Sequence, residues 1–366
     1  MRTRLSNTVD SQYLSILSKI KNEGCYKETR SGKVYSLFGL SMRFDLRNGF
    51  PVLTTKKMFT RGFIHELLWF LKGDTNIKYL VDNNVNFWTP DAYRFYKELI
   101  DKDAELRQLF DGGDGLDYDT YESFIENVKS GTKLELVKSY NKEIGKPEYF
   151  KYTYGDLGEV YGHQWRHWGN TNFDQIKMII DTLRTNHNDR RLLLTGYNPE
   201  VVKDIALPPC HTLYQFYARP LTYTEKVAWC EENISDANEW KHTIEEIMQS
   251  NGCPKYGLSL WFSCRSQDMP LGNPANIMSA SLLLSMVAQC VDMLPCEVIW
   301  NGGDCHIYEN QMDGVNEQLT RDPHKYALPK LVLNKNIHEI DDFTFDDIKI
   351  EDYESYDTIK MPLSVG

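Results

Sequence analysis

The spacing of apolar residues predicts a mixture of helices and strands along the chain. Residues from about 10 to 23 and from about 61 to 83 carry apolar side chains three and four positions apart, as amphipathic helices do, and Gly73 is a typical helix stop. The stretch VYSLFGLSMRFDL alternates apolar and polar positions like a half-buried strand. SASLLLSMVAQCVDM predicts a further helix. Four more stretches predict strands: RRLLLTGY, HTLYQFYA, YGLSLWFSCRS and CEVIWNGGD.

Two charged segments interrupt this pattern. Residues from about 91 to 152 contain the glycine-broken run DGGDGLDYD and then many lysines and glutamates, which indicates an inserted small helical subregion. Residues from about 219 to 256 have the character of a second insertion. Because both lie between core-like elements, we expect one domain over residues 1–366 with two insertions. The mixture of elements favours an α+β fold, with α/β as the alternative.

The composition is that of an ordinary globular protein with an acidic balance. Hydrophobic residues make up 41% of 366 residues and the formal net charge is −11. This charge argues against a protein that coats nucleic acid, because such a protein needs a basic face. No apolar run follows the first ten residues and no stretch approaches about 18 apolar residues, so we expect neither a signal peptide nor a membrane span. The eight cysteines lack CxxC spacing and predict reduced thiols in the cytoplasm, with no disulfide frame and no zinc site.

The stretch LPPCHTLYQF marks Cys210 as a candidate nucleophile. Two prolines stiffen its approach, and cationic surroundings from arginines in neighbouring strands would lower a thiol pKa. The alternative is a core cysteine, since free cysteine is among the most buried residue types. His211 follows directly, but adjacent strand residues point to opposite faces, so it need not be the base for Cys210.

Arginines supply a second group of candidates. Arg190 and Arg191 follow one another, and Arg265 with Ser266 begins a polar turn after an apolar strand. Guanidinium groups and a hydroxyl suit phosphate oxygens, although surface ion pairing explains most arginine pairs.

Polar residues in apolar surroundings form the third group. His306 and Tyr308 in WNGGDCHIYEN are two positions apart, so in a strand they would share one face and could donate to a sugar hydroxyl. The alternative is an incidentally polar strand after a turn. Glu66 lies in an otherwise apolar helix, where a carboxylate is either paired in the core or acts with bound water at a site.

Taken together, these segments resemble the thymidylate synthase family. The matching motifs follow the family order over nearly the whole chain outside the two insertions: RSGKVYSLFG, LTTKK, HELLWFLKGDTNI, NNVNFW, GDLGEVYGHQWR, NDRR, LPPCHTLYQF, CRSQD, PLGNPANI and WNGGDCHIY. The resemblance implies a homodimer of α+β subunits that pack through a large mixed sheet. It also implies a 2′-deoxynucleoside 5′-monophosphate as substrate and 5,10-methylenetetrahydrofolate as cosubstrate, with no metal and no obligatory nucleic acid.

By this resemblance, Cys210 would add to C6 of the pyrimidine and turn C5 into a nucleophile. C5 of uracil is otherwise a poor nucleophile, so covalent addition divides one hard step into easier ones. C5 would then attack the folate methylene, lose its proton and expel tetrahydrofolate, which leaves an exocyclic methylene.

The resemblance also implies substrate contacts, residue by residue. Arg265 and Ser266 match phosphate contacts, and Arg190 with Arg191 match a pair that reaches the same phosphate across the dimer. The remaining matches are Arg30 at the phosphate, Gln215 at the nucleotide, and His306 and Tyr308 at the sugar 3′-hydroxyl.

Asn276 matches the side chain that reads the O4/N3 edge of the pyrimidine. An amide can accept from N3–H and donate to O4, which suits uracil, whereas an aspartate would suit cytosine. The resemblance therefore favours dUMP over dCMP.

Further matches concern proton transfer and the folate. Glu66, His211 and Tyr161 match members of a water network that moves protons at O4 and C5. The folate matches are Asp268 at the pterin ring, Trp88 and Leu207 in an apolar wall, Leu271 and Gly272 in the same pocket, and Lys56 near the glutamyl tail.

The chain departs from the usual family pattern near the substrate. Ala275 stands where an aromatic residue is usual and Asn273 where an apolar residue is usual, which would enlarge or wet the wall behind the pyrimidine. IMSAS replaces a run that usually contains a tyrosine, and Thr89 replaces a common aspartate. The C-terminus extends one glycine, Gly366, beyond the usual aliphatic ending. In the family this tail closes over the site and excludes water.

Water access would decide the product. A dry pocket lets tetrahydrofolate deliver hydride to the methylene, which gives dTMP and is our leading hypothesis. Water capture would give 5-hydroxymethyl-dUMP, as in the related viral hydroxymethylases, and the two insertions hint at a phage or viral source. A third hypothesis, a regulator that binds nucleotide or RNA without turnover, is disfavoured by the acidic balance and the intact nucleophile.

Overall fold

The computed structural model describes residues 8–29, 31–110, 112, 115–234, 246, 248 and 250–363, and at residue 170 only the backbone. Contacts divide these residues into two compact units. The first contains residues 8–60, 175–194 and 210–363, and the second contains residues 61–174 and 195–209. The expectation of one domain with two insertions stays a prediction.

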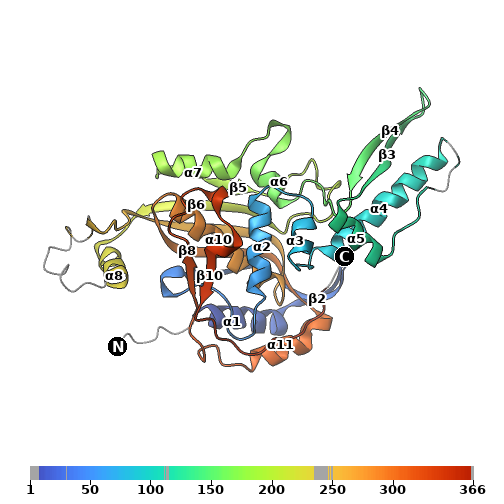
Figure 1. Cartoon of the computed structure of the whole chain (residues 1–366). Coiled ribbons are helices and arrows are strands. Elements are labelled where there is room, and N and C mark those ends of the chain that lie inside the picture. Colours follow the sequence, from blue (N-terminus) through green and yellow to red (C-terminus); the bar gives the residue numbers. More distant parts are fainter. Residues whose placement is uncertain are drawn as a thin grey trace. The chain divides into compact units, whose positions relative to one another are not determined.

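A six-stranded sheet in the order β1-β2-β8-β7-β6-β5 forms the centre of the first unit (Figure 1). β7 and β8 run parallel, whereas β1–β2, β2–β8 and β6–β7 are antiparallel, which confirms a mixed sheet. The strands are β1 (Cys25–Thr29), β2 (Gly32–Asp45), β5 (Leu193–Thr195), β6 (His211–Pro220), β7 (Tyr256–Asp268) and β8 (Leu294–Tyr308). Every stretch predicted as a strand contains one, and β8 continues past the predicted end to Tyr308.

Helix α10 (Gly272–Cys290) packs on β7 and β8. Nearly all its side chains are buried, because its sequence is apolar on every side. It begins at Gly272 and not at the predicted Ser279, since Pro274 fits the first turn of a helix, where a missing N–H breaks no bond. Ala275 and Asn276 therefore lie on a rigid helix.

Other helices and a small hairpin complete the first unit. Buried Asp10 of α1 accepts the N–H groups of Thr54 and Thr55, each at 2.9 Å, and so fixes the loop that carries Lys56. The elements are α1 (Thr8–Glu23), α7 (Gln175–Thr185), α8 (Tyr223–Asn233), α11 (Met312–Leu319), the antiparallel pair β9 (Lys330–Leu333) and β10 (Ile348–Glu351), and the 3-10 turns η1 (Leu46–Asn48), η4 (Glu309–Gln311), η5 (Ile340–Asp342) and η6 (Phe345–Asp347).

The described part of the second insertion belongs to this unit. α8 begins with a capping box, in which the Thr222 side chain accepts from the Glu225 N–H and the Glu225 carboxylate accepts from the Thr222 N–H. Arg219 also pairs with Glu225, at 2.6 Å. These bonds anchor the insertion to the end of β6.

The second unit is mainly helical. Its elements are α2 (Thr60–Leu71), α3 (Lys78–Asp82), α4 (Thr89–Gln108), α5 (Tyr121–Ser130), α6 (Tyr161–Arg166), η2 (Gly169–Thr171), β3 (Lys133–Asn141) and β4 (Lys146–Thr153). α2 ends where predicted: Gly73 has a φ of +68° and donates its N–H to the Phe70 carbonyl at 3.0 Å.

The prediction of a helical first insertion is wrong in part. After α4 and α5 the chain forms the antiparallel hairpin β3–β4 (Figure 1). Charged residues alternate with Leu134 and Leu136 in this segment, and that period of two suits a strand. Buried Asp103 of α4 accepts the Val137 N–H at 2.7 Å, which holds the hairpin to the helix. In the part of the chain that the structure describes, no helix is long and apolar enough to cross a membrane.

Candidate active site

The sheet register brings several predicted substrate residues to one edge of the first unit. His211 at the start of β6 pairs with Cys264 of β7, and Asp268 at the end of β7 pairs with His306 of β8. Because β6 is antiparallel to β7 and β8 is parallel to it, the start of β6 lies beside the ends of the other two strands. Cys210 directly precedes β6 and lies at this edge.

Cys210 is half-buried and joined to the neighbouring strand through its backbone. Its carbonyl accepts the N–H of Arg265 at 2.8 Å. Arg265 is exposed and Ser266 is half-buried. By contrast, the neighbouring Cys264 and Cys305 are buried, and burial raises the pKa of Cys305 to about 12. Of these three cysteines, Cys210 is the one that is not fully buried, as a reactive thiol requires.

His211 is buried and neutral. Burial lowers the pKa of its imidazole to about 3, and its Nδ1 lies 2.8 Å from the Tyr214 hydroxyl. A ring with this pKa does not hold an extra proton near neutral pH. His211 therefore cannot form an imidazolium–thiolate pair with Cys210, although it can exchange hydrogen bonds with water. This agrees with the interpretation that it need not be the base.

A glutamine that the sequence analysis did not single out holds Asn276. The Asn276 Nδ2 donates to Oε1 of Gln267 at 3.2 Å, and Gln267 is 2% exposed. This partner fixes the direction of the amide, which is the property a group needs to tell uracil from cytosine.

His306 and Tyr308 share one face of β8, as their spacing predicts. Their rings meet edge to face, with centroids 5.1 Å apart. The His306 Nδ1 lies 3.2 Å from the Asp304 carbonyl. Burial raises the pKa of Tyr308, so its hydroxyl stays protonated and can donate.

Asp268 is the last residue of β7 and directly precedes the turn to α10. Its Oδ1 accepts the Leu271 N–H at 3.0 Å and its Oδ2 accepts Nε2 of Gln311 at 3.1 Å. Burial raises the pKa of the carboxyl, and these two bonds oppose that effect. Gly272 follows, where a Cβ atom would lie 3.1 Å from Nε2 of Gln267. The turn is thus packed closely against the residue that holds Asn276.

Lys56 supports the same turn from within the unit. Its side chain is 4% exposed, and its ammonium donates to the Pro270 carbonyl. Burial lowers the pKa of the ammonium to about 8. Its predicted position near a glutamyl tail is not tested by these contacts and stays a prediction.

The two arginines that are predicted to reach across a dimer lie at the surface. Arg190 and Arg191 are exposed, and Arg191 pairs with Asp189 at 2.6 Å while its side chain remains 88% exposed. Gln215 donates to the Arg190 carbonyl at 3.4 Å. Arg30, the other predicted phosphate residue, lies outside the described residues, as does Gly366.

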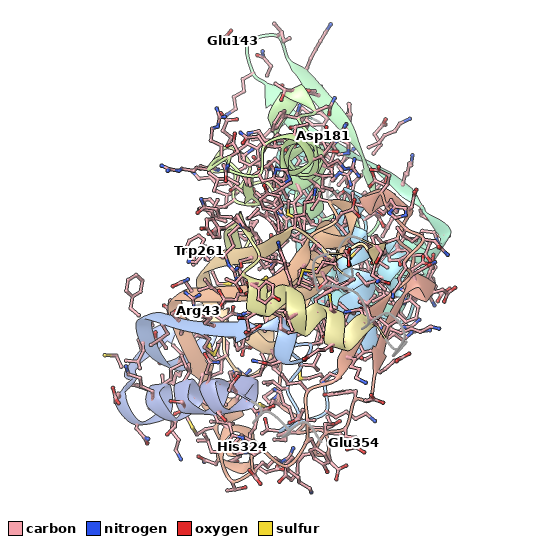
Figure 2. All side chains as sticks on the ribbon, turned by 90° about the vertical axis from the view of Figure 1, so that its left-hand side faces the viewer. Arg43, Glu143, Asp181, Trp261, His324 and Glu354 are labelled. Carbon is pink, nitrogen blue, oxygen red and sulfur yellow. The ribbon has the colours of Figure 1, made fainter. Side chains whose placement is uncertain are left out.

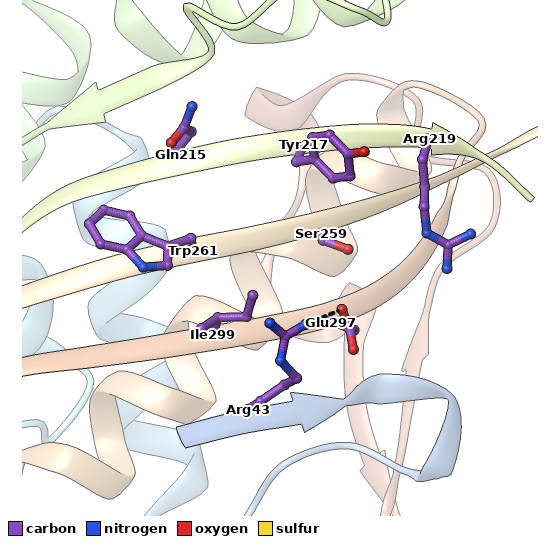
Figure 3. A pocket seen from close by; sticks show the side chains of 8 residues that line it. All are labelled: Arg43, Gln215, Tyr217, Arg219, Ser259, Trp261, Glu297 and Ile299. Atoms are coloured by element: carbon purple, nitrogen blue, oxygen red, sulfur yellow. Dashed lines mark hydrogen bonds and ion pairs between the residues drawn. The ribbon is translucent and has the colours of Figure 1, made fainter. Parts of the chain in front are cut away.

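Gln215 also lines a hollow of about 490 Å³ on the sheet (Figure 3). Figure 2 marks two of the lining residues, Arg43 and Trp261, on this part of the unit. The hollow spans four strands and contains the ion pair between Arg43 and Glu297, at 2.9 Å. Its lining residues are Arg43, Gln215, Tyr217, Arg219, Ser259, Trp261, Glu297 and Ile299.

In the second unit, Glu66, Trp88 and Tyr161 lie together. The Trp88 Nε1 donates to Oε1 of Glu66 at 2.6 Å, and the Trp88 and Tyr161 rings meet edge to face at 6.0 Å. Burial raises the pKa of Glu66 to about 7, an effect that the Trp88 bond opposes. A carboxyl with this pKa can both give and take a proton near neutral pH.

Leu207 belongs to the separate 195–209 segment of the second unit and is half-buried. Its neighbour Ala206 fixes the segment: the Ala206 carbonyl accepts from Arg94 at 2.5 Å and its N–H donates to the Leu157 carbonyl at 2.9 Å. The backbone at Leu207 is therefore held in place.

The raised pKa of Glu66 predicts a pH dependence of stability. Between pH 4.5 and pH 7 the folded protein keeps a proton that the unfolded chain has lost, so this contribution to stability is present below pH 4.5 and is lost as pH rises through about 7. Glu66→Gln cannot ionise, so it should lose less stability than the parent between pH 5 and pH 8. Urea midpoints at both pH values measure this, and an equal loss in both proteins would contradict the prediction.

Metal ligands do not gather in the described residues: no group of three or more His, Cys, Asp and Glu side chains there could hold an ion. The structure also adds three residues that sequence reasoning missed, namely Tyr214, Gln267 and Gln311. Each is a polar residue in a segment that is otherwise apolar or that contains predicted site residues. This is the one sequence feature that could have indicated them.

Comparison with known proteins gives a consistent match. The thymidylate synthase family model matches residues 11–365. The thymidylate synthase of Mycoplasma mobile is 39% identical over 355 residues, which cover 97% of this chain and 99% of that protein. Those of Aster yellows witches'-broom phytoplasma and Phytoplasma mali are 38% and 37% identical, each over 96% of this chain and 99% of the relative.

Proposed function

The chain belongs to the thymidylate synthase family, and we propose that it transfers the one-carbon unit of 5,10-methylenetetrahydrofolate to C5 of dUMP through Cys210, giving dTMP. The observation that carries the role of Cys210 is its position. It is a half-buried cysteine, bonded through its backbone to Arg265, at the sheet edge that also bears His306, Tyr308 and Asp268.

The first chemical step would form one bond and move one electron pair. The Cys210 sulfur adds to C6, and the electrons of the C5–C6 double bond move toward O4. The rigid Asn276 amide, held by Gln267, accepts from N3–H and donates toward O4 as charge builds there. Neutral His211 supplies hydrogen bonds to water and no positive charge.

C5 then attacks the folate methylene and forms the new carbon–carbon bond. Loss of the C5 proton and of the folate nitrogen leaves an exocyclic methylene. Hydride from tetrahydrofolate then completes the methyl group, while the C5–C6 double bond re-forms and the Cys210–C6 bond breaks, so that dTMP, dihydrofolate and the free Cys210 thiolate are released. For these proton transfers we propose Glu66 and Tyr161, as the family resemblance implies. The Glu66 pKa of about 7 supports this role, because such a group exchanges protons readily at neutral pH.

We propose that the Asp268 carboxylate binds the pterin ring. Its carboxylate is fixed on one side by Leu271 and on the other by Gln311, and a fixed carboxylate can accept two N–H donors of a flat ring. We propose that Trp88, Leu207, Leu271 and Gly272 serve the same folate, with Lys56 supporting the turn through Pro270.

The product assay tests the function directly. With dUMP and methylenetetrahydrofolate, we expect a product of dTMP mass and one dihydrofolate, seen by its absorbance, for each dTMP. Every named relative is a thymidylate synthase, which favours this outcome over water capture. A product heavier than dTMP by one oxygen, without dihydrofolate, would overturn it.

We further propose a homodimer that packs through the sheet face bearing the hollow of Figure 3, with Arg190 and Arg191 donated to the partner's phosphate site. The exposure of both arginines supports this proposal. Each site would then contain residues of both chains, so an inactive Cys210→Ser chain and an inactive Arg190→Ala chain should complement one another.

Mixing the two variants after gentle unfolding and refolding should restore about a quarter of the parent activity, because random assortment gives half of the dimers one intact site in two. The control is each variant refolded alone, which should stay inactive. If mixing restores nothing while sedimentation shows dimers, the arginines do not act across the interface.

A further inference from the structure

Gln311 is a buried glutamine whose side-chain amide is bonded at both ends. It is 1% exposed and ends η4, directly after β8. Its Oε1 accepts the Tyr308 N–H at 3.2 Å. Its Nε2 donates to Oδ2 of Asp268 at 3.1 Å and to the Pro362 carbonyl at 3.3 Å. One amide thus joins three separate segments of the first unit.

The third of these segments is the chain that leads to the C-terminus, residues 352–363. It is docked on the unit at several points before Pro362: the Tyr356 N–H donates to the Thr54 carbonyl at 2.9 Å, and Ile359 is buried. A Cβ atom at Gly314 of α11 would come within 2.7 Å of Met361, so the tail packs directly on that helix. The bond from Gln311 is therefore made to a tail that is already in place.

The geometry of an amide makes this link directional. The Tyr308 N–H requires oxygen on one side of the Gln311 side chain, which places the two N–H groups of Nε2 on the other. With one N–H on the Pro362 carbonyl, the second points at Asp268. Moving the tail would release the first bond and leave the amide with two of its three bonds, so it would hold the Asp268 carboxylate less firmly.

We propose that Gln311 is a positioning residue that couples docking of the C-terminal tail to the orientation of the Asp268 carboxylate, and so to folate binding. This inference rests on the proposed role of Asp268 at the pterin ring. Burying a polar side chain is costly unless its hydrogen bonds are made. If this position only filled space, an apolar side chain of the same size would do so with fewer buried polar atoms.

The test measures folate KM separately from dUMP affinity. Gln311→Leu removes all three bonds and should raise the KM for methylenetetrahydrofolate by about tenfold or more, as expected for loss of bonds to a charged group, while the Kd for dUMP changes less than about twofold. Gln311→Glu has nearly the same shape and can keep the bond to the Tyr308 N–H, but it places a second carboxyl group beside Asp268. Because two adjacent carboxyl groups repel one another or share a proton, the Asp268 carboxylate should lose its charge or its direction, and the folate KM should rise at least as much.

Gln318 provides the matched control. It is also a fully buried glutamine, and it donates to the Thr55 hydroxyl at 3.0 Å, away from the Asp268 carboxylate and the Pro362 carbonyl. Gln318→Leu should reduce stability to a similar degree without a comparable rise in folate KM. If both glutamine variants raise the folate KM equally, Gln311 has only a structural role.

A double-variant cycle tests the coupling itself. Deletion of residues 362–366 should raise the folate KM, and adding Gln311→Leu to that deletion should raise it by less than the product of the two separate effects, because both changes weaken the same link. Independent multiplication of the two effects would overturn the proposal. Asp268→Asn distinguishes the role of Asp268 in folate binding from the coupling through Gln311. If this variant leaves the folate KM unchanged, the proposed folate site is wrong. If Asp268→Asn raises the folate KM strongly but the Gln311 variants do not, only the coupling is refuted.

Discussion

Replacing Cys210 with serine is expected to lower kcat by about 10⁴-fold while the Kd for dUMP stays within about twofold of the parent value. A hydroxyl is a far weaker nucleophile than a thiolate unless a base removes its proton. The adjacent His211 cannot serve as that base through a stable imidazolium, because burial lowers the pKa of its ring to about 3. The serine would therefore sit in the site without adding to C6.

The control for this variant is Cys25→Ser. Cys25 is an exposed cysteine of β1 and is not one of the predicted site residues, so its loss should leave kcat unchanged. Steady-state rates and calorimetric dUMP binding measure both variants. Turnover by Cys210→Ser at more than a tenth of the parent rate would contradict covalent catalysis, and loss of dUMP binding would indicate a misfolded site.

The second large effect is expected from Asn276→Asp. A carboxylate cannot donate to O4 of uracil but can accept from the amino group of cytosine, and a site built to hydrogen-bond one group rejects the wrong one strongly. The ratio of kcat/KM for dUMP to that for dCMP should fall by about 10⁴-fold. Gln267 can accommodate the change by rotating its amide, so that Nε2 donates where Oε1 now accepts.

The control variant for this prediction is Ala275→Ser, which changes the neighbouring helical position without touching the amide. It should leave the preference for dUMP within about tenfold of the parent value. Competition assays with both nucleotides measure the ratio in each protein. An unchanged ratio in Asn276→Asp would show that another group reads the pyrimidine edge.

Much of the sheet could be predicted from sequence, because its signals are local. The strands around Cys210 and Arg265 alternate apolar and polar residues, and the motif order gives the family over nearly the whole chain. The position of His306 and Tyr308 on one face followed from their spacing alone. These predictions depend only on neighbours in the chain.

The failures involve partners that are distant in sequence or patterns that compete. The lysines and glutamates of the β3–β4 segment predict a helix, yet Leu134 and Leu136 have the two-residue spacing of a strand. No local sequence pattern predicts that the Lys56 ammonium group is buried against the Pro270 carbonyl. Hydrogen bonds between side chains hundreds of positions apart arise only when the fold closes.

Gln267 and Gln311 show the same limit within the candidate site. Neither glutamine stands out in the sequence. In the structure, Gln267 forms a hydrogen bond to Asn276 and Gln311 forms one to Asp268. The residues that would touch substrate were predicted by type and motif. The residues that orient them were not, because an amide can satisfy almost any polar neighbour.

The most direct test of the central claim is the mass of the Cys210 peptide in a stalled reaction. A dUMP analogue with fluorine at C5 has no proton there to lose, so the reaction should stop after C5 has bonded to the folate methylene. After denaturation and digestion, we expect the peptide containing Cys210 to carry the added mass of nucleotide plus folate, and the Cys210→Ser protein to carry none. An enzyme that makes dTMP from dUMP yet shows no adduct, or shows it on another peptide, would contradict covalent catalysis by Cys210.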